Sequence, residues 1–90
     1  MTTMEALKWA FEIKNASPEE RLVAIYIATI VNQDGVAVVD LAEAAKWCGF
    51  ISSARHIPRL QDVRGAIQSL PNIKYDYFDA CALIVMEDGK

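Results

Sequence analysis

The sequence predicts one mainly α-helical domain with a small β-hairpin, in the order helix, helix, strand, helix, helix, strand, strand. The chain has 90 residues, 53% of them apolar and 23% charged, which suits a single hydrophobic core and leaves no room for a second domain. Helix-capping residues and a hydrophobic stripe of helical period indicate the helices. Two β-prone runs near the C-terminus indicate the hairpin.

The first helix is predicted at residues 4–14, and it is apolar on two faces. Met4, Leu7 and Phe11 lie on one face, and Ala6, Trp9, Ala10 and Ile13 lie on the other. A helix with two apolar faces needs two packing partners.

A strong start signal marks the second helix. Ser17 is a suitable N-cap, Pro18 is tolerated in the first turn, and Glu20 stands where it can close a capping box. The following run, 22–31, is rich in β-branched residues and resembles a buried strand in composition, but the cap and its length favour a helix. Because this helix is apolar on most sides, we expect it to be the central buried element, ending near Asn32.

The remaining elements follow from caps and periodicity. Residues 36–39 are β-prone, Asp40 is a suitable N-cap for a helix at 41–48, and Gly49 suits a helix end. A further helix is predicted from about Pro58 to Leu70. Its core stripe has spacings of three, four and three residues and consists of Leu60, Val63, Ile67 and Leu70. Strands are predicted at 72–78 and 83–87.

Composition narrows the function classes. No stretch approaches the roughly 18 apolar residues of a membrane span, and the N-terminus lacks a signal-peptide pattern, so we expect a cytoplasmic protein without membrane contact. Cys48 and Cys81 form no metal-binding spacing with each other or with His56, the single histidine. With no nucleophile motif and no phosphate-binding loop either, we expect no metal, no cofactor and no enzymatic activity.

The element order is that of a winged helix-turn-helix domain, and the chain resembles the helix-turn-helix domains of phage and plasmid replication initiators and related regulators. The residues that carry the resemblance are Ala6, Trp9-Ala10, 17–23, Asn32-Gln33-Asp34-Gly35, Leu41-Ala42, Gly49, Val63, Ala66-Ile67, Leu70 and Ile73. The resemblance implies a regulator that binds double-stranded DNA, with the helix near 58–70 in the major groove.

The charge distribution agrees with this placement. The formal charge is −3, yet the segment 51–70 is net positive because it holds three arginines and one aspartate. Arginine and glutamine suit base edges, so Gln61, Arg64 and Gln68 are expected to face bases. Arg55, Arg59 and Lys74 are expected to hold phosphates, with Ser52 and Ser53 as further donors to phosphate. The candidate DNA-binding residues are Ser52, Ser53, Arg55, His56, Arg59, Gln61, Arg64, Gln68 and Lys74. A solvated helix face is the alternative interpretation.

Two departures from the family pattern favour a different use of the same scaffold. The turn before the recognition helix is expanded over residues 50–60, and the hairpin is acidic, with Asp76, Asp79, Glu87 and Asp88 against Lys74 and Lys90. An acidic hairpin repels phosphate. The alternative function is therefore a protein-interaction module, such as a phage- or plasmid-encoded regulator or inhibitor of a larger host complex.

Trp9 and Ile13 are candidates for a homodimer contact, because aromatic residues are favoured at buried interfaces and two-fold DNA readers need such a contact. Packing of these two side chains on the hairpin of their own chain is the alternative.

Overall fold

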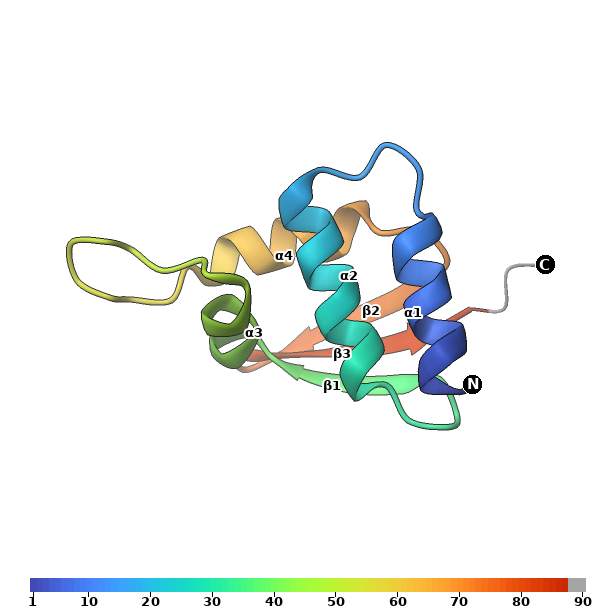
Figure 1. Cartoon of the computed structure of the whole chain (residues 1–90). Coiled ribbons are helices and arrows are strands. Elements are labelled where there is room, and N and C mark those ends of the chain that lie inside the picture. The colour runs from blue at the N-terminus through green and yellow to red at the C-terminus, as the bar shows by residue number, and fades with distance from the viewer. Residues whose placement is uncertain (88–90) are drawn as a thin grey trace.

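The helices and strands follow one another in the predicted order. The computed structural model describes residues 1–87. Its elements are α1 (Thr3–Glu12), α2 (Pro18–Ile30), β1 (Val36–Asp40), α3 (Leu41–Cys48), α4 (Leu60–Ser69), β2 (Ile73–Phe78) and β3 (Cys81–Met86). Figure 1 shows α1 and α2 side by side in front of the strands, with α3 and α4 toward the opposite end of the molecule from α1.

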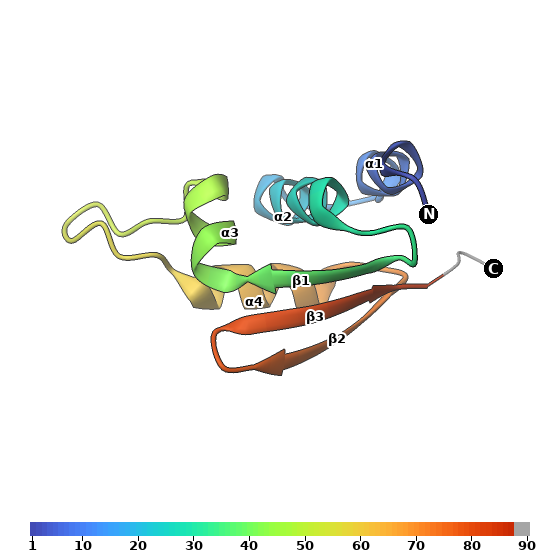
Figure 2. The same ribbon diagram turned by 90° about the horizontal axis from the view of Figure 1, so that it is seen from below.

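The strands form one antiparallel sheet in the order β1-β3-β2. The register places Val39 opposite Ala82 and Ala82 opposite Tyr77. Because β1 pairs with β3 as a third strand, the fold is an α+β domain of four helices and a three-stranded sheet rather than helices with an isolated hairpin. Figure 2 shows the helices on one side of this sheet.

The predicted caps are confirmed in atomic detail. Ser17 Oγ accepts a hydrogen bond from the backbone N–H of Glu20 at 3.1 Å, and the Glu20 carboxylate accepts one from the N–H of Ser17 at 2.8 Å. Asp40 accepts hydrogen bonds from the N–H groups of Ala42 and Glu43. Gly49 ends α3 with a φ of 79°, the left-handed conformation that favours glycine.

The core lies between α2, the other helices and the sheet. As predicted, α2 is central, since it contacts α1, α3, α4 and β1. Its buried face and the facing elements contribute the largest fully enclosed side chains, which are Ile27, Leu41, Ile67, Ile84, Val23, Val39 and Val63. The buried residues of the predicted stripe on α4 anchor that helix to this core.

Three predicted boundaries differ from the structure. The fourth helix begins at Leu60 rather than near Pro58, because Pro58 forms a β-bridge with Ile51 and Arg59 has a non-helical backbone. The hairpin turn contains only Asp79 and Ala80, so β3 begins earlier than predicted. The first helix ends at Glu12, two residues before the predicted end.

Candidate binding surface

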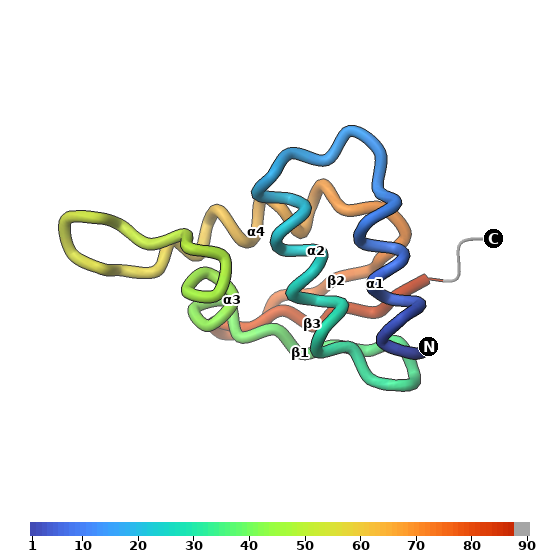
Figure 3. Tube along the Cα trace, viewed as in Figure 1, coloured from blue at the N-terminus to red at the C-terminus, as the bar shows by residue number. Residues whose placement is uncertain are grey.

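The expanded segment between α3 and α4 forms an ordered projection, residues 50–59, which we call the arm. Its two sides are joined by the Ile51–Pro58 bridge and by three backbone hydrogen bonds. The N–H of Ser52 donates to Ile57 O at 2.9 Å, that of His56 to Ser52 O at 2.7 Å, and that of Arg59 to Phe50 O at 2.8 Å. Figures 1 and 3 show the arm extending away from the body of the domain.

The tip of the arm presents polar, cationic and apolar groups together. Ser53, Arg55, His56 and Ile57 are exposed, whereas Ser52 is half-buried. His56 has a φ of 54°, which closes the turn at the tip. Ile57 is 52% exposed, a large exposure for a β-branched apolar side chain. Ile57 was not predicted from the sequence to have a role, because a single apolar residue in a segment without periodicity gives no signal.

At the base of the arm, Arg59 is already engaged within the protein. Its Nε lies 3.2 Å from Asp62 Oδ2, and its guanidinium stands 6.0 Å from the centre of the Phe50 ring. The nearby carboxylate offsets part of the positive charge that the sequence analysis assigned to phosphate binding.

The outer face of α4 carries the predicted base-reading residues. Gln61 and Gln68 are exposed and lie two turns apart on one side of the helix. Arg64 is half-buried, with its guanidinium 5.8 Å from the centre of the Tyr77 ring, and the Tyr77 hydroxyl donates to Arg64 O at 3.2 Å. Burial raises the pKa of Tyr77 above its ordinary value, so this hydroxyl remains a donor at neutral pH. The contact ties β2 to α4.

An acidic groove runs beside the N-terminal half of α4. Its lining residues, from α4 and from the start of α2, are Ser17, Glu19, Glu20, Gln61, Asp62, Gly65 and Ala66. Hydrogen bonding to the Ser17 backbone is the main cause that lowers the pKa of Glu20, which keeps this carboxylate ionised. The side chains of Glu19, Glu20 and Asp62 therefore line the same groove as Gln61, and their negative charge opposes the approach of a phosphate backbone.

Lys74 lies apart from the other predicted phosphate-binding residues. Successive side chains of a strand point to opposite faces, and Tyr77 of β2 faces α4, so Lys74 faces away from α4. Its Nζ is 3.9 Å from Glu87 Oε2. Asp88 and Lys90, which entered the predicted charge of the hairpin, lie outside the described residues.

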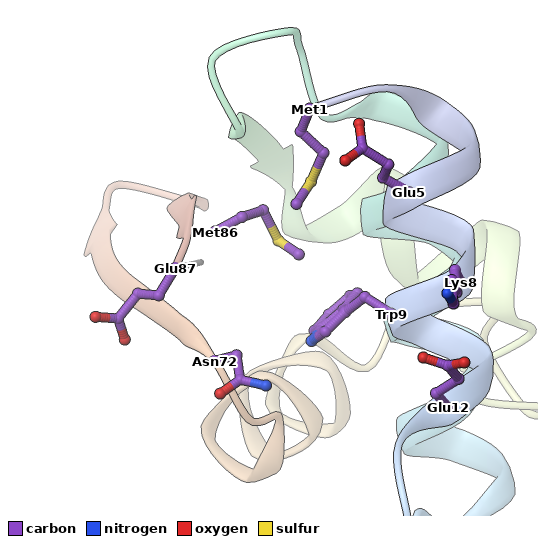
Figure 4. Close-up of a pocket in the computed structure, with 8 residues that line it drawn as sticks. All are labelled: Met1, Glu5, Lys8, Trp9, Glu12, Asn72, Met86 and Glu87. Carbon is purple, nitrogen blue, oxygen red and sulfur yellow. The ribbon is translucent and has the colours of Figure 1, made fainter. Parts of the chain in front are cut away.

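The two predicted dimer residues both pack on their own chain. Trp9 and Ile13 are half-buried against the core, and the Trp9 indole donates from Nε1 to Pro71 O at 3.1 Å. Figure 4 shows Trp9 extending from α1 toward the strand end that carries Met86, in a shallow pocket. For Trp9, the contacts lie beside the start of the hairpin, as in the alternative interpretation of the sequence.

We also searched the described residues for a metal site and a membrane-spanning helix, and compared the chain with known proteins. Within residues 1–87, no group of three or more histidine, cysteine, aspartate or glutamate side chains is arranged to hold a metal ion. Among the helices of the same residues, none has the length and apolar character needed to cross a bilayer. Comparisons with protein-family models, with curated proteins and with solved structures gave no match to this chain.

Proposed function

We propose that this chain is a non-enzymatic protein-interaction module on a winged helix-turn-helix scaffold, and that the arm is its binding element. The element order, the sheet order β1-β3-β2 and the hairpin that follows α4 support the scaffold. The proposal depends chiefly on the arm, a hydrogen-bonded projection that exposes Ile57 beside Arg55 and His56.

Electrostatics favours a protein partner over DNA. A phosphate-binding surface needs cations that converge and remain free to replace counterions. Here Arg59 pairs with Asp62, and Lys74 faces away from α4 and lies near Glu87. The acidic groove adds the carboxylates of Glu19 and Glu20 beside α4, and the whole chain has a formal charge of −3.

The chemistry of the arm indicates what the partner offers. An exposed apolar side chain gains most when it enters an apolar pocket that excludes water, and a cation beside it gains from an acidic rim. We therefore expect a pocket for Ile57 with carboxylates placed near Arg55. Because backbone hydrogen bonds already order the arm, binding costs less conformational entropy than it would for a disordered loop.

Capture experiments with matched variants test this proposal. The double variant Arg55→Glu/Ile57→Asp changes only exposed side chains of the arm, so we expect it to unfold like the wild type. Proteins captured by the wild type from a lysate of the cells that carry the gene should be lost with this variant. The control Gln61→Ala/Gln68→Ala, on α4, should retain them. If the arm variant still captures the same proteins and the control variant does not, the proposal is wrong.

Double-stranded DNA is the second candidate, because Gln61 and Gln68 remain exposed on the same side of α4. Fluorescence anisotropy with a random-sequence duplex tests it over a range of salt concentrations. If four phosphates are neutralised, the logarithm of the affinity should fall against the logarithm of the salt concentration with a slope of about −3.6. DNA binding would be the better explanation if the duplex binds with this salt dependence, if Arg64→Glu abolishes that binding, and if Ile57→Asp leaves it unchanged.

A further inference from the structure

The first helix buries only one of its two apolar faces. Ala6 and Ala10 are fully enclosed on the core side. On the other side, Met4 is 77% exposed and Phe11 is 62% exposed, the largest exposures of any large hydrophobic residue among residues 1–87. The second packing partner that the sequence requires for this helix is therefore not supplied by the described part of the chain.

The exposed residues form a continuous stripe along α1. Met4, Leu7 and Phe11 follow one another at spacings of three and four residues, which places them on one side of a helix. Leu7 lies between the other two and is half-buried. Together with Glu5 and Lys8, these three residues line a shallow groove on the outer surface of the helix. We call Met4, Leu7 and Phe11 the α1 stripe.

We propose that the α1 stripe binds the α1 stripe of a second copy of this chain, with the two helices antiparallel. A two-fold axis beside Leu7 places Met4 of each copy against Phe11 of the other. Contact between a thioether and an aromatic ring is favourable, and the two-fold symmetry produces this Met4–Phe11 contact twice in the dimer. A parallel arrangement would instead set Met4 against Met4 and Phe11 against Phe11.

Charge complementarity supports a second copy as the occupant. Glu5 and Lys8 lie on the same flank of the stripe and have opposite charges. In an antiparallel pair, this flank of one helix faces the same flank of the other helix, which runs in the opposite direction. Lys8 of each chain therefore lies near Glu5 of the other. A parallel pair with a two-fold axis along the helices would place the two flanks on opposite sides of the contact, where Glu5 and Lys8 form no such pairs. The surface therefore complements itself in one orientation only.

The size of the contact sets the expected strength. A helix of ten residues is about 15 Å long, and two such helices bury less than the standard interface of roughly 1,600 Å². We therefore expect a reversible dimer that forms at tens of micromolar, about 10–100 µM.

Sedimentation velocity from about 5 to about 500 µM protein tests the proposal. The wild type should shift from monomer to dimer over this range. Phe11→Ser should weaken the dimer at least about tenfold, whereas Phe78→Ser, the same change at an exposed phenylalanine on β2, should leave it unchanged. A wild type that stays monomeric throughout, or a dimer lost with Phe78→Ser and retained with Phe11→Ser, overturns the proposal.

Charge reversal and cross-linking test the orientation. Lys8→Glu should weaken the dimer severalfold, and Lys46→Glu on α3 should not. In a background with Cys48→Ser and Cys81→Ser, mixed Met4→Cys and Phe11→Cys chains should form a disulfide between the two variants, identified by peptide mass. Disulfides formed only within each variant would show a parallel pair and overturn the antiparallel arrangement.

Discussion

Replacing Gly65 with alanine should stabilise the protein, although it changes a residue in the middle of a helix on a candidate binding face. A Cβ built at this position has no other atom within 4 Å apart from the helix's own neighbouring backbone. The substitution therefore adds no clash, and it removes the conformational freedom that glycine has in the unfolded chain. Glycine in a helix interior costs about 0.5–1 kcal/mol relative to alanine, so Gly65→Ala should raise the free energy of unfolding by that amount.

Gly49→Ala is the matched control, because its new Cβ also meets nothing within 4 Å. The backbone at Gly49 has a φ of 79°, where an L side chain clashes with its own carbonyl, so this variant should lose about 1–2 kcal/mol. For a domain of this size, 1 kcal/mol shifts the melting temperature by about 4–8 °C. The two variants should therefore move in opposite directions in thermal and urea unfolding. A Gly65→Ala protein that melts at or below the wild-type temperature would refute the packing argument.

Other predictions concern the cap, the core and a thiol. Ser17→Ala removes the hydroxyl that caps α2 and should lower the free energy of unfolding by about 1 kcal/mol in urea titrations; an unchanged midpoint would contradict this. Ile67→Ala leaves a cavity at a fully buried site on α4 and should lower the free energy of unfolding by about 2–5 kcal/mol in the same assay. A smaller decrease would contradict tight packing around Ile67. Burial raises the pKa of Cys48 to about 11, so at pH 8 its thiolate fraction is about 100-fold lower than that of a thiol at the ordinary value of 9.0, and its alkylation by iodoacetamide should be slower. Because the raised pKa favours the protonated thiol in the folded state, its contribution to stability is complete below about pH 9 and is lost as the pH rises through about 11; stability that increases across this interval would contradict the assignment.

Local signals predicted the helices well because their causes are local. The capping box of Ser17 and Glu20 and the left-handed Gly49 depend on residues within a few positions of one another, and both occur as predicted. The run 22–31 was ambiguous by composition, and the cap before it resolved the ambiguity correctly. In each case the deciding interaction spans one helical turn.

Features that depend on distant parts of the chain were harder to predict. Pairing of Val39 with Ala82 makes β1 the third strand of the sheet, and β1 and β3 are separated by two helices and a strand in the sequence. The bridge between Ile51 and Pro58 orders the arm and delays the start of α4, yet residues 50–57 have no period that would reveal it. Long-range pairing of this kind leaves little trace in local composition.

The candidate binding surface was also hard to predict, because its electrostatics depends on residues that are distant in the sequence. The positive charge of 51–70 is a property of the sequence, whereas the field at α4 also depends on Glu19 and Glu20, which the fold brings beside it from α2. The sequence showed that α1 has two apolar faces without showing which one faces the core. Burial of Ala6 and Ala10 leaves the α1 stripe exposed, because small side chains allow the close approach of α2.

The positions of the arm and the α1 stripe bear on how the two proposed contacts would work together. Both views place the arm and α1 at opposite ends of the domain, whose longest extent is 43 Å. A dimer through α1 would therefore display two arms facing away from each other. Two arms on one rigid unit can bind a partner with repeated sites far more tightly than one arm, provided that the sites match their separation. If both proposals hold, Phe11→Ser should weaken binding to such a repeated partner while binding to a single isolated site stays unchanged. Equal loss at both kinds of site would instead place Phe11 within the partner interface itself.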